Sequence, residues 1–483
     1  MKNELLRGSH IYVTEQNTNL LEDFNFDLYE GEILGVCGLS GSGKSVLCDL
    51  LTGRRALSGG TLYYRGREIR SAEIAGGRTL RVIDVNRNQP KLIPDLTIYE
   101  NLTLLSAESW FPDLTRRIWT NRIRGVFSLL DLHFDLNRKA GDLSLAEQFF
   151  IEIARAVLNR CELLIFHLIS YDFSTSDYTV FQRILHILSD HNISIINIEA
   201  RADYLIGESD RILVIREGSD AFVFPKNEQK AENILKAMEV TVQTGAYRPV
   251  PVNRDPESVF SISDLMMGNI LCDRLNVRRG EFVGIIHENG QVPAELMQFF
   301  RHEIEAETGS IFLNGQSLDI HLNIEKLTGL GMGFVDGYKE NGLLTQSVAQ
   351  NLLLSSYRFI PGPLINGREE KTLIAEALRN VGLTEADADR LLMEFGLFER
   401  QKIIFERWLL ARPAILIMDY PFRRMDDRLL EWFRSYLARL RKSGTAVLCT
   451  MPDDPQYMAL CDAVYVIAGS RLLPLQKVSV QKF

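Results

Sequence analysis

A short run of glycine, serine and lysine residues could bind the phosphates of a nucleotide. It consists of Gly38, Leu39, Ser40, Gly41, Ser42, Gly43, Lys44 and Ser45. Backbone N–H groups of such a loop cradle phosphate oxygens, the lysine reaches the outer phosphates, and the final serine ligates Mg²⁺. The spacing therefore predicts a site for a nucleoside triphosphate with Mg²⁺, in which Ser45 is the metal ligand.

The residues on either side place this loop between a strand and a helix. Ile33, Leu34 and Val36 form a short apolar strand in front of it. Behind Lys44, apolar residues recur at helical spacing until Gly53, a natural helix stop: Val46, Leu47, Leu50 and Leu51. The loop thus meets the positive end of a helix dipole, which favours a bound anion. A chance glycine-rich turn does not require this order of strand, loop and helix, so we disfavour that alternative.

The composition is that of a globular protein without a basic surface. The chain has 483 residues, of which 46% are hydrophobic and 24% are charged, and a formal net charge of −9. Its length suits about two to four domains, and its acidic balance argues against nucleic acid as a partner. The six cysteines form no C-x-x-C pair, which predicts buried thiols in a reducing compartment.

No segment of the sequence predicts a membrane crossing. The apolar runs stay below the roughly 18 residues that span a bilayer, and we expect no signal peptide. Any role at a membrane would therefore require a partner.

The second half of the chain repeats the first. Residues 31–35 (GEILG) return as residues 280–284 (GEFVG). The same shift of about 250 residues relates four further pairs of segments: 100–102 and 350–352, 151–158 and 403–410, 163–166 and 415–418, 210–215 and 462–467. We predict two copies of one domain, residues 1–240 and 258–483, joined by a proline-containing linker at residues 241–257.

Strands and helices alternate in each copy. The order is strand, phosphate-loop position, helix, a helix-rich middle, another strand and an αβ finish. The helix-rich middles span residues 114–136 and 369–395. This order predicts an α/β core with a helical insert in both copies.

The chain resembles the tandem ATP-binding subunits of ABC importers for ribose, galactose and related sugars, over nearly its whole length. Residues 92–101 (LIPDLTIYEN) are similar to the family's segment after the Q-loop, and residues 401–409 (QKIIFERWL) are similar to a segment of its second half. The resemblance implies two tandem P-loop NTPase domains of the ABC type, each with a helical subdomain, that pair head to tail. It also implies ATP and Mg²⁺ as cofactors. The implied partners are membrane permease subunits and, through them, a sugar-binding protein.

In the first copy, the residues that carry hydrolysis in the family are replaced. His167 and Leu168 stand where an aspartate anchors Mg²⁺ and a glutamate orients or deprotonates the attacking water. Imidazole is a poor ligand for a hard cation, and leucine accepts no proton. We favour a packing or hydrogen-bonding role for His167 over that of a substitute base. The position of the family's switch histidine is Ala200.

Two further motifs of the first copy also depart from the family. The Q-loop glutamine position is Asn88, with Gln89 beside it as the alternative after a one-residue slip. The signature motif reads LSLAE at residues 143–147. It keeps Ser144 but lacks the glycines that let a backbone approach a γ-phosphate.

The second copy has lost the phosphate loop itself. Pro293 and Ala294 occupy the lysine and serine positions, and Glu288 adds negative charge. At the later strand end Asp419 persists while Tyr420 replaces the glutamate, so we favour a structural hydrogen-bonding role for Asp419 over a metal anchor. The signature position reads FGLFE at residues 395–399, where we expect Phe398 to block a γ-phosphate by its bulk.

These departures predict no catalytic residues. We expect an ATP-binding subunit of a sugar-type importer that binds ATP in its first copy and hydrolyses it weakly or not at all. The alternative is a nucleotide-sensing or scaffold protein without a transport role. A third possibility, a tandem ATPase acting on ribosomes or DNA, is disfavoured by the acidic charge and the short linker.

Overall fold

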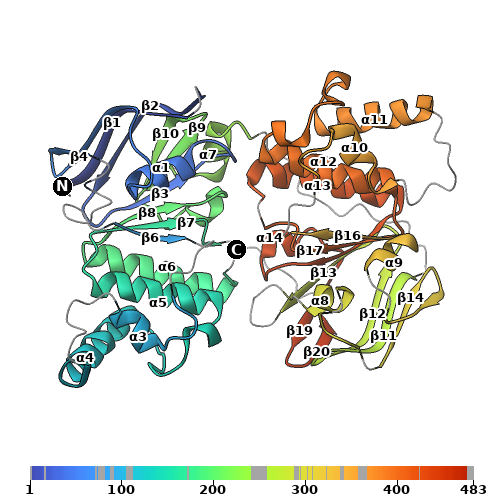
Figure 1. Cartoon of the computed structure of the whole chain (residues 1–483), viewed down its shortest axis with the longest axis horizontal. Coiled ribbons are helices and arrows are strands. Elements are labelled where there is room, and N and C mark those ends of the chain that lie inside the picture. Colours follow the sequence, from blue (N-terminus) through green and yellow to red (C-terminus); the bar gives the residue numbers. More distant parts are fainter. Residues whose placement is uncertain are drawn as a thin grey trace. The chain divides into compact units, whose positions relative to one another are not determined.

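The chain forms two compact units, Met1–Val242 and Gln243–Phe483. The computed structural model describes residues 3–15, 18–70, 73, 82–86, 92–104, 112–170, 173–240, 258–287, 293, 295–301, 303–306, 308–321, 324–337, 342–356, 367–423 and 425–475. Figure 1 shows the elements of both units. The predicted linker at residues 241–257 lies outside the described residues.

Unit one contains an antiparallel sheet with the strand order β2-β1-β4-β5. Its apolar side chains alternate with polar ones, as expected for strands with one buried face. The buried residues of this sheet pack in one hydrophobic cluster with those of helix α1. The bounds are β1 (Glu4–Glu15), β2 (Thr18–Tyr29), β4 (Gly59–Tyr64) and β5 (Arg67–Ile69).

The second sheet of unit one is mostly parallel, with the order β10-β9-β3-β8-β7-β6. Strand β10 pairs antiparallel with β9, and the other neighbouring pairs are parallel. The carboxyl ends of β3, β8 and β7 therefore lie at one edge, where α/β proteins place their ligands. The bounds are β3 (Ile33–Cys37), β6 (Val82–Asn86), β7 (Leu163–His167), β8 (Ser194–Ile198), β9 (Arg211–Arg216) and β10 (Ser219–Pro225).

Helices cover this parallel sheet. Residues of α5, α6 and β7 share one buried cluster, which also takes in residues of α3 and α4. The bounds are α1 (Lys44–Leu51), α3 (Ile98–Thr103), α4 (Pro112–Leu130), α5 (Leu145–Leu158), α6 (Thr175–Asp190) and α7 (Ala231–Ala237). Short 3₁₀ turns in the chain are Ala140–Asp142, Ala202–Tyr204, Lys226–Glu228, Glu385–Asp387 and Leu392–Glu394.

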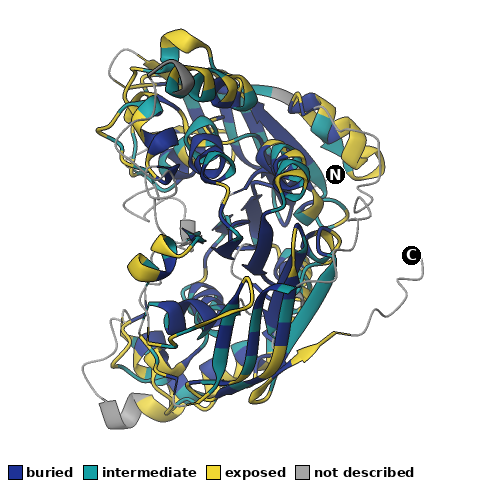
Figure 2. Ribbon diagram, turned by 90° about the vertical axis from the view of Figure 1, so that its right-hand side faces the viewer, coloured by how far each residue is buried: buried dark blue, intermediate teal, exposed yellow. Residues whose placement is uncertain are grey.

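Unit two repeats this layout in a ten-stranded sheet, β15-β14-β11-β12-β20-β19-β13-β18-β17-β16. Figure 2 colours its central strands dark blue, and β13, β17 and β18 are almost entirely buried. The strands are β11 (Ser258–Met267), β12 (Ile270–Arg278), β13 (Phe282–His287), β14 (Ser310–Leu313), β15 (Gln316–Leu318), β16 (Met332–Asp336), β17 (Ile415–Asp419), β18 (Ala446–Thr450), β19 (Ala463–Ala468) and β20 (Arg471–Pro474). The helices are α8 (Glu295–Phe300), α9 (Ile324–Gly329), α10 (Val348–Leu353), α11 (Gly367–Val381), α12 (Leu397–Ala411), α13 (Asp427–Ser443) and α14 (Pro455–Met458).

Each predicted helix-rich middle contains one long helix that ends within it. In unit one, α4 stops at Leu130 because Asp131 takes a left-handed backbone, with φ at 52°. In unit two, α11 stops at Val381 before Gly382, whose φ is 78°. Turns and short 3₁₀ segments follow up to the next long helix.

The repeated asparagine performs the same structural task in both units. The amide of Asn101 donates to the carbonyls of residues 93, 96 and 97 and accepts from the N–H of Ile93. The amide of Asn351 does the same for residues 343, 346 and 347. Both side chains are buried, so each asparagine fixes the turn that precedes a short helix.

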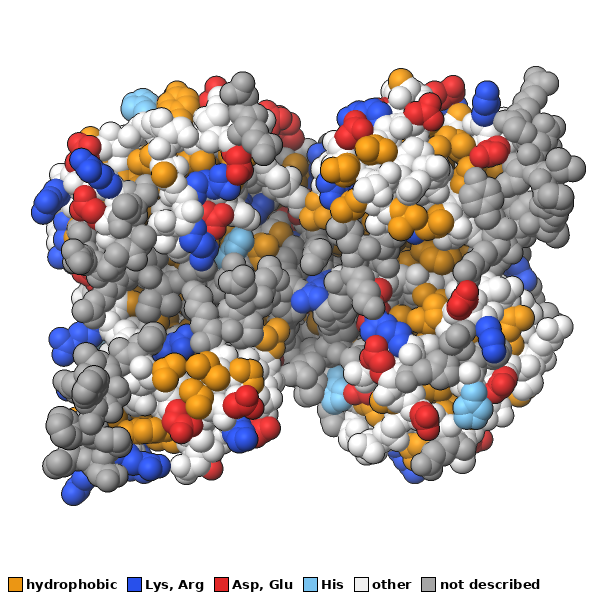
Figure 3. Space-filling view, in the orientation of Figure 1, with side chains coloured by type: hydrophobic (Ala, Val, Ile, Leu, Met, Phe, Trp, Pro, Cys, Tyr) orange, Lys and Arg blue, Asp and Glu red, His pale blue; other side chains and the backbone are white. Residues whose placement is uncertain are grey.

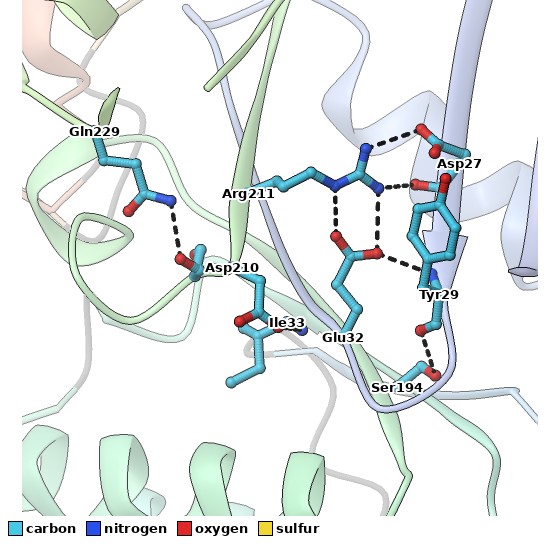
Figure 4. Close-up of polar contacts among 9 residues, drawn as sticks. Asp27, Tyr29, Glu32, Ile33, Ser194, Asp210, Arg211 and Gln229 are labelled. Atoms are coloured by element: carbon cyan, nitrogen blue, oxygen red, sulfur yellow. Dashed lines mark hydrogen bonds and ion pairs between the residues drawn. The ribbon is translucent and has the colours of Figure 1, made fainter. Parts of the chain in front are cut away.

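A polar cluster anchors β3 to β9 at the sheet edge remote from the phosphate loop. Figure 4 shows Arg211 reaching both Glu32 and Asp27, with Nε to Glu32 Oε1 at 2.6 Å and Nη1 to Asp27 Oδ1 at 3.1 Å. Asp210 accepts from the N–H of Ile33 at 3.1 Å. These contacts fix the start of the strand that leads into the loop.

All six cysteines are buried, as predicted, and none of them forms a disulfide. In the part of the chain that the structure describes, no helix combines the length and apolarity of a membrane span. On the face drawn in Figure 3, acidic and basic side chains are interspersed over each unit.

Candidate nucleotide site

The phosphate loop of unit one connects β3 directly to α1. Gly38, Gly41 and Gly43 all have positive φ angles. At Gly43, φ is 109°, and an added Cβ would lie 2.8 Å from Cδ2 of Leu21. A side chain at this position would therefore need a strained backbone and displacement of Leu21. At Gly41, by contrast, a Cβ would meet nothing within 4 Å.

The side chain of Lys44 folds back over the phosphate loop. Its side chain is only 7% exposed, and its ammonium donates to the carbonyl of Gly38 and to that of Leu39, the latter at 2.9 Å. Ser42 is also buried, and its hydroxyl makes no hydrogen bond to any described residue. The loop thus combines the positive charge of Lys44, glycines without side chains and the unsatisfied hydroxyl of Ser42. This combination fits a bound phosphate chain.

Ser45, the predicted metal ligand, contacts His167. Ser45 is exposed near the start of α1, and His167 is the last residue of β7. Ser45 Oγ and His167 Nε2 are 3.3 Å apart, in a hydrogen bond whose direction depends on the imidazole tautomer. The hydrogen-bonding role favoured for His167 is thus observed. One hydroxyl and one imidazole do not form the all-oxygen ligand set that Mg²⁺ prefers.

The residues after His167 do not provide a base at the position of the lost glutamate. Leu168 has a left-handed backbone, with φ at 57°, and its N–H donates to Ile198 at 2.8 Å. Glu199 follows β8 and is fully buried. Its carboxylate accepts from the N–H of Ser170 at 3.2 Å and from the Ser170 hydroxyl at 2.6 Å. This carboxylate therefore stabilises the loop after β7.

The buried region around Glu199 also shifts the pKa of a tyrosine. Burial raises the pKa of Tyr178 well above its ordinary value, and the negative charge of Glu199 raises it further. The Tyr178 hydroxyl donates to the carbonyl of Tyr204 at 2.5 Å, so its proton is held in a structural hydrogen bond. Ala200, at the switch-histidine position, is also buried.

The signature segment of unit one is a helix cap. The Ser144 hydroxyl accepts from the N–H of Glu147 at 3.1 Å, and the Glu147 carboxylate accepts from the N–H of Ser144 at 2.7 Å. This reciprocal capping box satisfies two free N–H groups at the start of α5. The sequence signal for this cap is a serine followed three residues later by glutamate. The Q-loop residues Asn88 and Gln89 lie outside the described residues.

In unit two, a guanidinium binds the carboxylate that the sequence retains. Asp419 ends β17, and its Oδ2 lies 3.2 Å from Arg301 Nη2. The same nitrogen lies 2.8 Å from Oδ2 of Asp336, which ends β16. Asp419 Oδ1 accepts from the Thr450 hydroxyl at 2.7 Å. The structural role favoured for Asp419 is observed, whereas Arg301, 118 residues away in sequence, was not anticipated.

Burial dominates the electrostatics of this cluster. It raises the pKa of Asp419, while the hydrogen bond from Thr450 and the charge of Arg301 lower it and Asp336 raises it. Tyr420 is buried and donates its N–H to the Thr450 hydroxyl at 3.0 Å. Of the degenerate loop, His287 and the buried Pro293 are described, while residues 288–292 and 294 lie outside the described residues.

Phe398, expected to act as a bulky block, makes contacts within unit two. Its ring packs against the buried cluster of α12 and α13. The guanidinium of Arg428 lies 4.1 Å and the ammonium of Lys402 4.4 Å from the ring centroid. These cation–π contacts give the side chain a packing role inside its own unit.

A strand, a glycine loop and a helix at the edge of a parallel sheet define a P-loop nucleotide-binding protein. The family model for ABC transporters matches residues 21–166 and 273–423, and the chain belongs to that family. The prediction of two tandem α/β P-loop domains of the ABC type is confirmed.

The chain is similar along most of its length to curated members of the family. A ribose import ATP-binding protein of Oceanobacillus iheyensis is 24% identical over 468 residues, which cover 95% of this chain and 93% of that protein. A second, of Escherichia coli O157:H7, is 26% identical over 456 residues, covering 92% and 89%. A solved structure of CbiO1 from Clostridium perfringens, part of the ABC transporter complex CbiONQ, is 18% identical. It covers 48% of this chain and 93% of that one, with a TM-score of 0.44.

Proposed function

We propose that this chain is the ATP-binding subunit of a sugar-type ABC importer, and that it binds one ATP, in unit one, with weak or absent hydrolysis. The names of the similar proteins, which cover nearly the whole chain, support the import role. The geometry of the loop at residues 38–45 supports the nucleotide site. These eight residues hold the phosphates, and Ser45 holds the accompanying divalent cation, which is Mg²⁺ in most such proteins.

The single-site proposal rests on a contrast between the two units, each considered at the equivalent edge of its own sheet. In unit one, Lys44 is positioned in a loop of left-handed glycines. In unit two, Pro293 replaces this lysine, and Arg301 already neutralises the carboxylate that would face a cation. A bound guanidinium and a bound metal ion compete for the same oxygens, so unit two is a poor site for a metal–nucleotide complex.

Weak hydrolysis follows from the side chains around the loop of unit one. Leu168 cannot accept a proton, and the carboxylate of Glu199 is buried in hydrogen bonds with Ser170. A positioned general base is worth roughly 10²–10⁴-fold in rate, and its loss alone would leave a slow enzyme. We assign no residue of this chain a catalytic role.

The proposed partners are membrane permease subunits and, through them, a sugar-binding protein. The chain would then lie in the cytoplasm, peripheral at the inner face of the cell membrane. An importer subunit must deliver the energy of nucleotide binding to a membrane channel, so a permease contact is required by the proposed role.

The nucleotide site is tested by equilibrium titration of the full chain with a fluorescent ATP analogue. We expect a stoichiometry near one and loss of binding in Lys44→Ala. The matched control is Lys402→Ala in unit two, because Lys402 is also 7% exposed and its ammonium also donates to a backbone carbonyl, that of Val381. Two equivalent sites, or equal effects of the two substitutions, would contradict the proposal.

Two further measurements address hydrolysis and transport. Phosphate release should stay near background and should not change in Lys44→Ala, whereas robust release lost in that variant would refute weak hydrolysis. Purification from membranes should retain permease subunits with the chain. Nucleotide binding without any permease would instead favour a nucleotide-sensing or scaffold protein.

A further inference from the structure

The contact between Ser45 and His167 has the dimensions of a metal-binding pair. Ser45 Oγ and His167 Nε2 lie 3.3 Å apart. Two neighbouring ligands of one octahedral ion, each about 2.1 Å from it, lie about 3 Å apart. The two atoms therefore need to move only slightly to ligate one cation together.

The strand arrangement holds this pair in place. His167 ends β7, which pairs in parallel with β8, and β8 pairs in turn with β3, the strand before the loop. Leu168 donates its N–H to Ile198 at 2.8 Å, so the backbone next to His167 is fixed to β8. Ser45 is fixed by its place in the first turn of α1. The imidazole and the hydroxyl thus approach each other from rigid elements.

The chemistry of the pair selects among cations. Mg²⁺ and Ca²⁺ prefer oxygen ligands, whereas imidazole nitrogen suits the later first-row divalent ions, whose affinity rises from Mn²⁺ through Co²⁺ to Ni²⁺. The carboxylate of Glu199, which follows the adjacent strand β8, is buried in hydrogen bonds with Ser170. The Ser45–His167 pair therefore offers nitrogen where a carboxylate would favour magnesium.

We propose that unit one binds its nucleotide together with a late first-row transition-metal ion in preference to Mg²⁺, and that His167 is a direct ligand beside Ser45. This inference rests on the proposed function, because the nucleotide phosphates must supply further oxygen ligands. It makes His167 the residue that determines metal specificity at this site.

The test measures the affinity of the full chain for the fluorescent ATP analogue in excess EDTA, in Mg²⁺ and in Co²⁺. The affinity in EDTA is the reference. Relative to it, we expect the increase in Co²⁺ to be at least roughly ten times the increase in Mg²⁺, because loss of even an outer-shell partner of a metal ion costs roughly 10–100-fold in metal affinity. His167→Ala should remove the difference. His167→Asp, which restores a carboxylate, should shift the preference towards Mg²⁺. His133→Ala changes an exposed histidine of the same unit and should leave the preference unaltered.

A second readout uses the unaltered chain and does not depend on the folding of a variant. The visible absorption spectrum of Co²⁺ should change when the analogue and the chain are added together, and the change should indicate that a nitrogen atom ligates the ion. Equal effects of Mg²⁺ and Co²⁺ on a binding that still requires Lys44 would refute the metal preference and leave the proposed function intact. Absence of Lys44-dependent binding in every condition would refute the proposed function, and the inference with it.

Discussion

Removal of Arg301 should destabilise unit two and make its stability depend on pH. Arg301 follows α8 and binds the carboxylates of Asp336 and Asp419 with a single nitrogen, at 2.8 and 3.2 Å. The exposed fractions of the three side chains are 22%, 12% and 4%, in the order Arg301, Asp336 and Asp419. Arg301→Ala would remove the counter-charge that these two neighbouring carboxylates share.

The size of the effect follows from this geometry. At 3.2 Å, one pair of unit charges interacts by about 5 kcal/mol for an effective dielectric constant of about 20. Breaking a buried ion pair by removing one partner costs about 3–5 kcal/mol. Because Arg301 is partly exposed and Asp419 keeps its hydrogen bond from Thr450, we expect the lower end, about 3 kcal/mol, in the free energy of unfolding.

The pH dependence has a definite sign. Burial already raises the pKa of Asp419, and the charge of Arg301 opposes that rise. Without Arg301 the pKa of folded Asp419 moves further above its unfolded value of about 3.9. The folded state then binds more protons than the unfolded state, so the stability of Arg301→Ala should fall as the pH rises through the raised pKa. Acidification from about pH 7 to about pH 5 should restore part of the loss.

Hydrogen-exchange mass spectrometry in increasing urea can measure this for peptides of β17 and β18, separately from peptides of unit one. The matched control is Arg471→Ala, which breaks an exposed pair with Asp273 at 3.9 Å and should cost less than about 1 kcal/mol. Adding Asp419→Asn to Arg301→Ala should recover much of the stability and flatten the pH profile. A loss as small as that of the control, or one independent of pH, would show that Arg301 is not an essential counter-charge.

Two more substitutions test local geometry. Gly43→Ala should abolish binding of the ATP analogue, because its Cβ would displace Leu21. The Cβ of Gly41→Ala meets open space, so this substitution should cost only about 1–2 kcal/mol, from backbone strain. Similar titration curves for the two variants would contradict this. Asn351→Ala should destabilise unit two by about 2–3 kcal/mol, since it leaves buried backbone groups unpaired, and Asn101→Ala should do the same to unit one in thermal unfolding.

The phosphate loop could be predicted from the sequence because all of its determinants are local. The strand, the glycines and the helix of residues 33–51 follow one another without interruption, and the structure places them as expected. The repeated sequence segments also have the same local structure, because Asn101 and Asn351 fix equivalent turns. The sequence analysis did not predict the end of α4, because a left-handed Asp131 leaves no mark in an apolar pattern.

The contacts that define the chemistry are not local. His167 reaches Ser45 across 122 residues of sequence, and Arg301 reaches Asp419 across 118. The sequence could show that His167 replaces a carboxylate, but its partner depends on the order of strands in the sheet. Nothing in the pattern around Arg301 singles it out, since one arginine after a short helix is more often a solvated side chain.

Both units now carry a nitrogen-bearing side chain at the sheet edge where family members hold a metal ion, yet the two replacements have opposite consequences. In unit two the carboxylate remains and Arg301, which stays charged at any relevant pH, satisfies it. A cation entering there would have to displace an ion pair, which disfavours a metal ion at this position. In unit one the carboxylate is gone and the imidazole of His167 stands beside Ser45. An imidazole of this kind can still accept a cation, provided that the ion tolerates nitrogen. If the proposed function holds, the two units differ in which cation can enter as well as in whether the loop survives. The metal dependence of nucleotide binding would then distinguish unit one from unit two.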